Sequence, residues 1–363
     1  MRKWIWSCFF VVLSVAAYSQ VEKGSWLIDF NGHTGYESEQ EIISPQLYAK
    51  IGYFPTNFLA VGARLGGSGF LQENNNFGNV LYAGFARYYI NPQSENFHFF
   101  GEMESGLLVD YEEGMDKQSR FFFKPLAGMS YKLIEGLGLE VGLGLTFMES
   151  LNTSQIRYHG LSFELGWKAT ISHRSAEALE ETEQYFGRGK ISLAASFNLN
   201  NSFDQFIAAL RSSTETELNS EALRFTSLSE SNSNLGIIDV GFGFFLSDRT
   251  MFNIGLGIVN YGSSDFEPAT TLFSISPGLR YYLPLGDGRT NMYLQGAYEF
   301  GGVNQSGLGA ESTYNYINGG VGLTYMIGPA VAIELGADYG KLSGTFIQTS
   351  RPIKFYYGLR IFL

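Results

Sequence analysis

Acidic and basic side chains recur at alternate positions along most of the chain, and they are the residues with the clearest chemical potential. They fall opposite the apolar face of extended segments, at Asp29, Lys50, Arg64, Arg87, Glu102, Glu104, Lys124, Glu140, Glu164, Lys168, Asp239, Arg280, Glu299, Glu334, Asp338, Lys354 and Arg360. Facing charges of this kind could line an ion path. They could also form a buried network of ion pairs, because a buried charge is stable only when it is paired.

The remaining reactive residue types show no catalytic or metal-binding arrangement. The four histidines, His33, His98, His159 and His173, lack the spacing of a metal site. His98 has no serine or aspartate on its face that would complete a nucleophile–base pair. We therefore expect no enzyme activity, no metal and no cofactor.

Two further ligand classes do not fit the sequence. The chain carries 35 Asp and Glu against 24 Lys and Arg, a net charge of −11, which argues against nucleic acid as a partner. The glycine-rich run at 301–307 precedes no predicted helix, so it is not a phosphate-binding loop.

The N-terminus has the features of a secretory signal peptide. Arg2 and Lys3 precede a short apolar stretch, and Ala17 to Ser19 offers a small-residue cleavage site. The stretch is too short to span a bilayer as a helix. We assign residues 1–19 to the signal peptide, so the mature chain contains no cysteine, since the only one is Cys8.

The segments that carry the charged residues alternate with period two. In the segment 163–171, Phe163, Leu165, Trp167 and Ile171 share one face, while Glu164 and Lys168 share the other. Segments of about ten residues with this pattern are typical of transmembrane strands. A soluble core could not hold charges in strand after strand, whereas a barrel interior can hold them while lipid covers the apolar face.

Short and long connections alternate between the segments. Short turns, such as 55–57, are followed by longer polar loops, such as 67–79. Barrels of the bacterial outer membrane have short periplasmic turns and long extracellular loops. We therefore expect an outer-membrane location with both termini in the periplasm.

The sequence matches itself at an offset of about 190 residues. Residues 86–90 (ARYYI) resemble 279–283 (LRYYL), and 140–142 (EVG) resemble 334–336 (ELG). This internal repeat predicts two eight-strand units, at 20–172 and 188–363. The helix-forming, acidic residues 173–187 between them predict a short periplasmic linker helix.

Two architectures fit this repeat: two tandem eight-stranded transmembrane β-barrels, or one sixteen-stranded barrel with a water-filled channel. With Lys132 and Lys190 included, five acidic residues face six basic ones in the first unit, and four face four in the second. Charge balance within each unit favours two separately packed interiors. The alternative of a single barrel stays open.

The longest connection, predicted at 200–233, breaks the repeat. Phe203, Phe206, Ile207 and Leu210 form a helical apolar stripe. We interpret the stripe as a helix packed on the barrel rim, with a plugging or partner-binding element as the alternative.

The last strand carries a family resemblance. The segment Tyr356–Leu363 (YYGLRIFL) resembles the C-terminal signal that the barrel-assembly machinery recognises. Each unit resembles the small eight-stranded barrels of the OmpA/OmpX type. The resemblance implies the assembly machinery and outer-membrane lipids as partners.

These observations predict an integral outer-membrane barrel with a structural or surface-interaction role. Its interiors would be plugged by the paired charges, and its loops would be exposed to an extracellular partner that the sequence does not define. The alternative function is porin-like passive transport of small solutes through one sixteen-stranded barrel.

Overall fold

The computed structural model describes most of the chain from Lys23 onward as strands and tight turns. The described residues are 23–37, 42–71, 76–90, 97–114, 116–134, 136–151, 157–171, 186–194, 223–228, 233–263, 270–286, 289–305, 311–345 and 349–363. The predicted signal peptide and nearly all of the predicted linker helix, 173–185, lie outside these ranges. No helix in the described part is both long and apolar enough to cross a bilayer.

Eight strands in the first half form a closed antiparallel barrel. They are β1 (Trp26–Glu37), β2 (Ile42–Tyr53), β3 (Leu59–Phe70), β4 (Phe77–Ile90), β5 (Phe97–Glu112), β6 (Gln118–Ile134), β7 (Leu137–Ser150) and β8 (Arg157–Ile171). Each strand pairs with the next along the chain. Three residue pairs between β8 and β1, from Trp26↔Ile171 to Ile28↔Ala169, close the ring.

The second half forms another closed barrel. Its strands are β9 (Ile191–Ala194), β10 (Leu223–Leu228), β11 (Ser233–Phe245), β12 (Thr250–Ser263), β13 (Thr270–Leu285), β14 (Thr290–Gln305), β15 (Glu311–Met326), β16 (Val331–Gly344) and β17 (Ile353–Phe362). The short β9 pairs with both β11 and β17, again through three residue pairs on the β17 side. The prediction of two tandem eight-stranded barrels is confirmed.

Each barrel closes on itself at one end of the strands. At the other end the two barrels share one continuous wall. There β1 pairs with β17, from Asn31↔Gly358 to Tyr36↔Ile353, and β10 lies between β8 and β11. Strands β1–β8, β10 and β11–β17 therefore make one ring of sixteen (8 + 1 + 7). We call this end of the strands the shared end and the other the twin-barrel end. The predicted alternative, one sixteen-stranded barrel with a water-filled channel, is not the fold, because each half closes on itself at the twin-barrel end.

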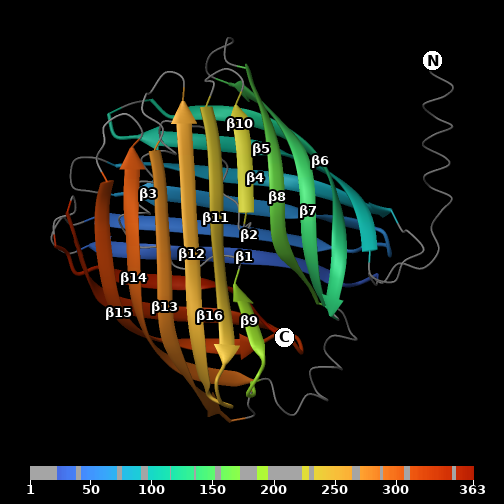
Figure 1. Cartoon of the computed structure of the whole chain (residues 1–363). Helices are drawn as coiled ribbons and strands as arrows, with labels where there is room; N and C mark the ends of the chain where they lie inside the picture. Colours follow the sequence, from blue (N-terminus) through green and yellow to red (C-terminus); the bar gives the residue numbers. More distant parts are fainter. Residues whose placement is uncertain are drawn as a thin grey trace, which may run out of the picture.

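Strands β9 and β10 occupy the two halves of a single strand position. Trp26 lies opposite Tyr53 of β2, and Ile191 takes the same place opposite Phe244 of β11. β10 continues this position toward the shared end, where it pairs with β11 from Leu223↔Ile238 onward. Figure 1 shows β9 and β10 one above the other beside β11.

The predicted loop at 200–233 is therefore wrong in part. Residues 223–228 form β10, which pairs on both sides. The preceding strand, β9, ends at Ala194, which pairs with Gly241 midway along β11. Alternation in 223–228 is weak and the flanks are polar, so only the hydrogen bonds from β8 and β11 make this segment a strand. The predicted helical stripe at 203–210 lies outside the described residues.

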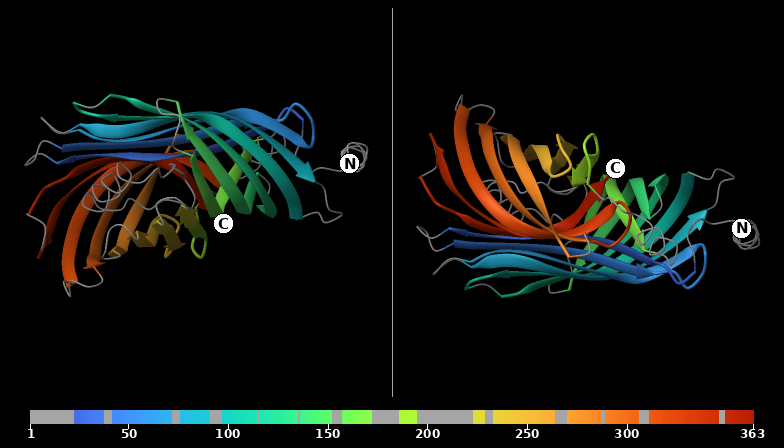
Figure 2. Two further views of the ribbon diagram at one scale, coloured as in Figure 1. Left: turned by 90° about the horizontal axis from the view of Figure 1, so that it is seen from above. Right: turned by 90° about the horizontal axis from the view of Figure 1, so that it is seen from below.

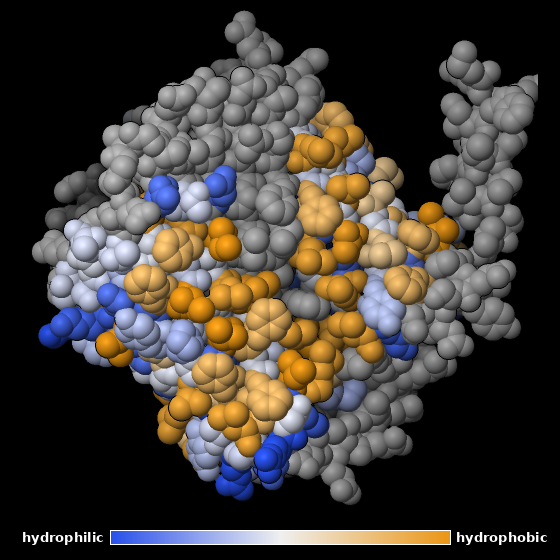
Figure 3. All heavy atoms as spheres, in the orientation of Figure 1, coloured by the Kyte–Doolittle hydropathy of each residue, from blue (hydrophilic) through white to orange (hydrophobic). Residues whose placement is uncertain are grey.

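Side chains alternate between an apolar outer surface and a mixed interior. On β4 and β5, for example, Tyr82, Phe99 and Met103 are at least half exposed. Figure 3 shows such apolar side chains spread across the wall. Seen from above and below in Figure 2, the strands of the two halves form two curved walls that lie side by side.

The outer faces of the two barrels meet at the twin-barrel end. Leu137 and Ala169 of the first barrel pack with Val331 and Ile361 of the second, and all four are at most 4% exposed. We call this cluster the septum. Its side chains point away from both interiors, so burial there comes from contact between the barrels.

Candidate functional site

The inward charges lie in the two barrel interiors, which are the candidate functional site. All the candidate residues predicted from the sequence are buried, with 1–9% exposure, apart from Asp239, whose side chain lies outside the described set. Lys132 and Lys190, which the sequence also placed inward, are only half-buried.

Arg87 is the centre of the network in the first barrel. Its Nε donates to Glu102 at 2.6 Å, and its Nη1 donates to Glu140 at 2.7 Å. The guanidinium also lies 4.1 Å from the ring centroid of Phe100. Lys50 donates a further hydrogen bond to Glu102 at 2.5 Å, so that this carboxylate is shared by two cations. Charge-assisted bonds in several directions are what a buried arginine requires.

The remaining charges of the first barrel are also paired. Arg64 donates to Glu104 at 2.7 Å, and Lys124 pairs with Glu164. Lys168 donates to Asp29 at 2.7 Å, and this bond crosses from β8 to β1, next to the residue pairs that close the barrel.

Arg280 has the corresponding place in the second barrel. It donates from Nη1 to Glu334 at 2.6 Å and from Nη2 to Gln295 at 2.8 Å, and it lies 4.0 Å from the ring centroid of Tyr293. Arg360 of the last strand donates to the second oxygen of Glu334 at 2.7 Å. The single negative charge of Glu334 is therefore shared by two arginines.

The two networks use matching residues. Arg87 bonds to Tyr89, two residues on, just as Arg280 bonds to Tyr282, each at 3.2 Å. Glu140 and Glu334, at matching positions of the two repeats, each form an ion pair with the arginine of their own half. The barrels differ at the neighbouring site, where the first has Glu102 and the second has the neutral Gln295.

Among the described side chains, buried positive and negative charges are equal in number in each interior. The first barrel buries five cations and five carboxylates, the sequence-derived set without the half-buried Lys132. Among the described side chains, the second buries three of each: Arg280, Lys354 and Arg360 with Glu299, Glu334 and Asp338. Neutral totals fit interiors in which each charge is matched by a neighbour rather than by water.

Apolar layers lie on both sides of the charges in the first barrel. Phe54, Tyr89 and Phe100 pack together toward the twin-barrel end. Leu108 and Phe122 belong to a second cluster toward the shared end. The two clusters thus lie on either side of the charge network along the first barrel.

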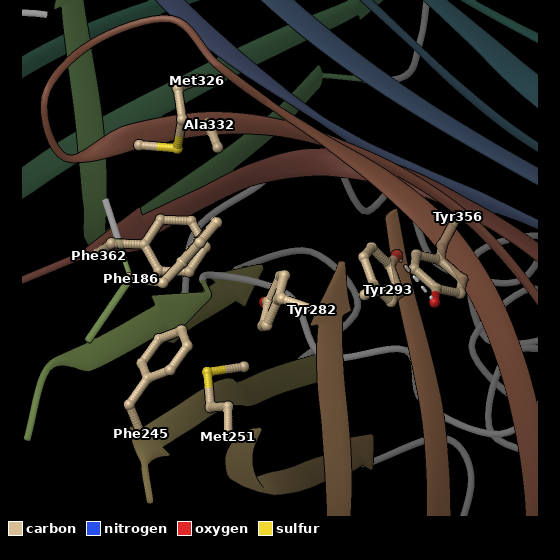
Figure 4. Packing of buried hydrophobic residues seen from close by; sticks show 9 residues of the cluster. All are labelled: Phe186, Phe245, Met251, Tyr282, Tyr293, Met326, Ala332, Tyr356 and Phe362. Atoms are coloured by element: carbon tan, nitrogen blue, oxygen red, sulfur yellow. Dashed lines mark hydrogen bonds between the residues drawn. The ribbon is translucent and has the colours of Figure 1, made fainter. Parts of the chain in front are cut away.

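An aromatic cluster is buried in the second barrel at the twin-barrel end (Figure 4). Phe186, from the end of the predicted linker, stacks on Tyr282 with ring centroids 4.6 Å apart. It also meets Phe362 edge-on at 4.9 Å and stacks on Phe245 at 5.6 Å. The sequence pattern did not predict this role for Phe186, because the residue precedes β9, the first strand of the second barrel, and belongs to no alternating segment.

Tyrosines continue the packing of the second barrel toward the shared end. The hydroxyl of Tyr314 donates to Glu299 at 2.9 Å, and that of Tyr316 donates to Asp338 at 3.2 Å. Leu342 packs with both rings. Large side chains and their hydrogen bonds thus fill this part of the interior.

The described residues present no alternative chemical centre. Among them, no three His, Cys, Asp or Glu side chains converge as metal ligands. His98 is buried, at 6% exposure, near the twin-barrel end. The side chains of His33 and His159, and the whole of His173, lie outside the described set. Between the linker and β9, burial lowers the pKa of the half-buried Lys190.

Comparison with known proteins gives similarities among solved structures only. A bacterial polysaccharide outer membrane secretin is 7% identical over 94% of this chain and 99% of its own, with a TM-score of 0.45. OccK5 (OpdH) of Pseudomonas aeruginosa is 11% identical over 94% and 99%, with a TM-score of 0.34. The CymD monoaromatic hydrocarbon channel is 9% identical over 94% and 89%, also with a TM-score of 0.34. No family model and no curated protein matches the sequence.

Proposed function

We propose that the protein is an integral outer-membrane β-barrel whose two interiors are closed, and that its role is structural or in surface interaction rather than enzymatic. The observation that carries this proposal is the paired, balanced charge network that lies between packed apolar or aromatic layers. A small eight-stranded barrel filled in this way leaves no room for a solute.

The outer surface supports a membrane location. Large apolar side chains such as Leu143, Leu161 and Leu335 are more than half exposed on strands whose other face is buried and charged. Exposed apolar area on this scale is unfavourable in water and favourable against lipid tails. Among the described strands, β1, β8, β10 and β17 each have a hydrogen-bonded neighbour on both sides, as a membrane-spanning wall requires.

The assignment extends the resemblance to OmpA/OmpX-type barrels. A cleaved signal peptide at 1–19, an origin by duplication and periplasmic termini belong to this proposal, as do the assembly machinery and outer-membrane lipids as partners. Matching contacts around Arg87 and Arg280 support the duplication. The loops at the shared end would then face the cell exterior and meet an extracellular partner.

Porin-like passive transport is the second candidate function. One observation favours it, the continuous sixteen-stranded ring at the shared end. A ring of sixteen strands can enclose a water-filled channel.

Planar-bilayer recording of the purified, refolded protein separates the two functions. If both interiors are closed, the parent protein should show no frequent, large unitary conductance. Regular large steps in every preparation would contradict the closed-barrel function and favour transport.

A further inference from the structure

Four strand positions meet where the shared wall divides into two barrels. β1 pairs with β8 at the twin-barrel end and with β17 beyond it. β8 pairs with β1 and then with β10, and β17 pairs with β9 and then with β1. Since β9 and β10 share one position, every strand at the junction changes partner at the same depth.

The alternative pairing needs no strand to slip. Extending the β1·β17 register toward the twin-barrel end would bring Ile28 opposite Ile361 and Trp26 opposite Leu363. Since β9 continues the position of β10 on β11, extending the β8·β10 register would bring Leu193 opposite Ala169. Three residue pairs in each closure would be lost. The strand ends that they free would pair again in the two new seams, β1 with β17 and β8 with β9.

From this equivalence we infer that the junction is a strand-exchange hinge, through which the twin barrels can merge into one sixteen-stranded channel. The inference rests on the proposed function, because it takes the closed twin-barrel form as the resting state. The backbone hydrogen bonds do not distinguish the two forms, so side chains must set the preference.

Two side-chain features hold the resting form. The septum buries Ala169 and Ile361 between the barrels. The bond from Lys168 to Asp29 ties β8 to β1. In a merged wall the septum side chains would face lipid instead of each other, so their contact favours only the twin-barrel form.

Because the septum stabilises only the twin-barrel form, a variant that disrupts it should shift the equilibrium toward the merged form. In Ala169→Phe, the added ring would overpack the septum but would meet only lipid in the merged wall. The matched control is Ala63→Phe, because Ala63 is exposed on the outer surface of β3. We expect Ala169→Phe to open large unitary conductances at least about tenfold more often than the parent or the control, given the usual cost of overpacking.

A disulfide tests whether these openings come from the hinge. The predicted mature chain has no cysteine. Trp26→Cys with Ile171→Cys would therefore join β1 to β8 where they are direct register partners. In the Ala169→Phe background, oxidation should abolish the openings and reduction should restore them.

The contrary results are distinct. A folded Ala169→Phe protein that stays closed would overturn the hinge and leave the closed-barrel function intact. Frequent large conductance in the parent, in the Ala63→Phe control and in the oxidised double-cysteine protein alike would overturn both the hinge and the closed-barrel function. If Ala169→Phe does not fold, Trp26→Cys with Leu363→Cys in the otherwise native chain replaces it. That pair should accumulate a disulfide over time, and its absence would overturn the hinge.

Discussion

At the scale of single residues, the interior is organised by two arginines. Arg87 and Arg280 each have a tyrosine hydroxyl, an aromatic face and a carboxylate within contact distance. A planar guanidinium can satisfy several such partners at once, which a lysine cannot. The carboxylates that pair with these arginines are Glu140 and Glu334. Glu334 forms ion pairs with two arginines, Arg280 and Arg360, so its loss should affect both.

Removing either carboxylate charge should destabilise the fold. We expect Glu140→Gln and Glu334→Gln to lower the free energy of unfolding by about 3–5 kcal/mol, since each removes a carboxylate partner from a buried arginine. The loss should be larger for Glu334→Gln, which affects two arginines, whereas Arg87 keeps Glu102. Urea unfolding of the refolded protein in detergent measures the difference.

Glu112→Gln is the control for these variants, because Glu112 is exposed at the end of β5. Its unfolding curve should match that of the parent. Unchanged stability in both buried variants would remove the main support for the closed interiors.

Phe186 makes a second residue-scale prediction. We expect Phe186→Ala to cost about 3–5 kcal/mol in stability, as for other buried Phe truncations, because its ring contacts Phe245, Tyr282 and Phe362. Phe244→Ala is the matched control, since Phe244 is exposed on the outer face of β11. Thermal unfolding followed by heat-modifiable gel mobility compares the two. Equal shifts would show that Phe186 does not close the barrel.

At the scale of elements, each barrel begins in the same way. Gly24 and Gly189 have φ values of 91° and 87°, and their N–H groups donate to the carbonyls of Phe54 and Phe245 at 2.9 and 3.0 Å. The backbone N–H groups of the preceding residues, Lys23 and Arg188, donate to side-chain oxygens in the first turn of each barrel. The acceptors are Asn57 Oδ1 at 2.8 Å and Asp248 Oδ1 at 3.2 Å. These bonds fix where the first strand enters the wall, and in the second barrel they also fix the approach of Phe186.

The left-handed backbone at Gly189 should not accept a side chain. We expect Gly189→Ala to destabilise the start of β9 by about 1–2 kcal/mol, because a Cβ is strained at this φ. Hydrogen exchange at Ile191 to Ala194 should rise. Gly101→Ala is the control, since Gly101 has no positive φ and a Cβ there would meet nothing within 4 Å. Equal protection in both variants would contradict the role of the turn.

At the scale of the whole molecule, the barrels are joined by strand pairing as well as by the linker. A fragment of residues 20–172 loses the partners of β1 and β8 at the shared end. It can regain them by extending the β1·β8 register, which brings Tyr36 opposite Leu161. We expect this fragment to fold alone into a fully closed, heat-modifiable barrel.

Cysteines at Tyr36 and Leu161 test this closure. They should form a disulfide in the fragment but not in the full chain, where Tyr36 pairs with Ile353 and Leu161 with Ser227. A fragment that fails to fold would contradict independent closure of the first barrel. A cross-link in the full chain would contradict the pairing of β1 with β17 and of β8 with β10 at the shared end.

The sequence by itself determined the wall and its two faces. Period-two alternation depends only on the geometry of a strand, so Glu140, Glu334 and the other inward charges could be found without coordinates. Charge balance within each half also followed from counting, and so did the two eight-strand units.

Only the tertiary structure decided how the walls close. A strand edge presents the same hydrogen-bonding groups to any partner, so nothing in the sequence of β1 chooses between β8 and β17. The answer depends on contacts far apart in the chain, such as the septum and the bond from Lys168 to Asp29. For the same reason β10 and the buried position of Phe186 could not be predicted. β10 is a strand because it pairs with β8 and β11, and Phe186 is buried because it packs against Phe245, Tyr282 and Phe362.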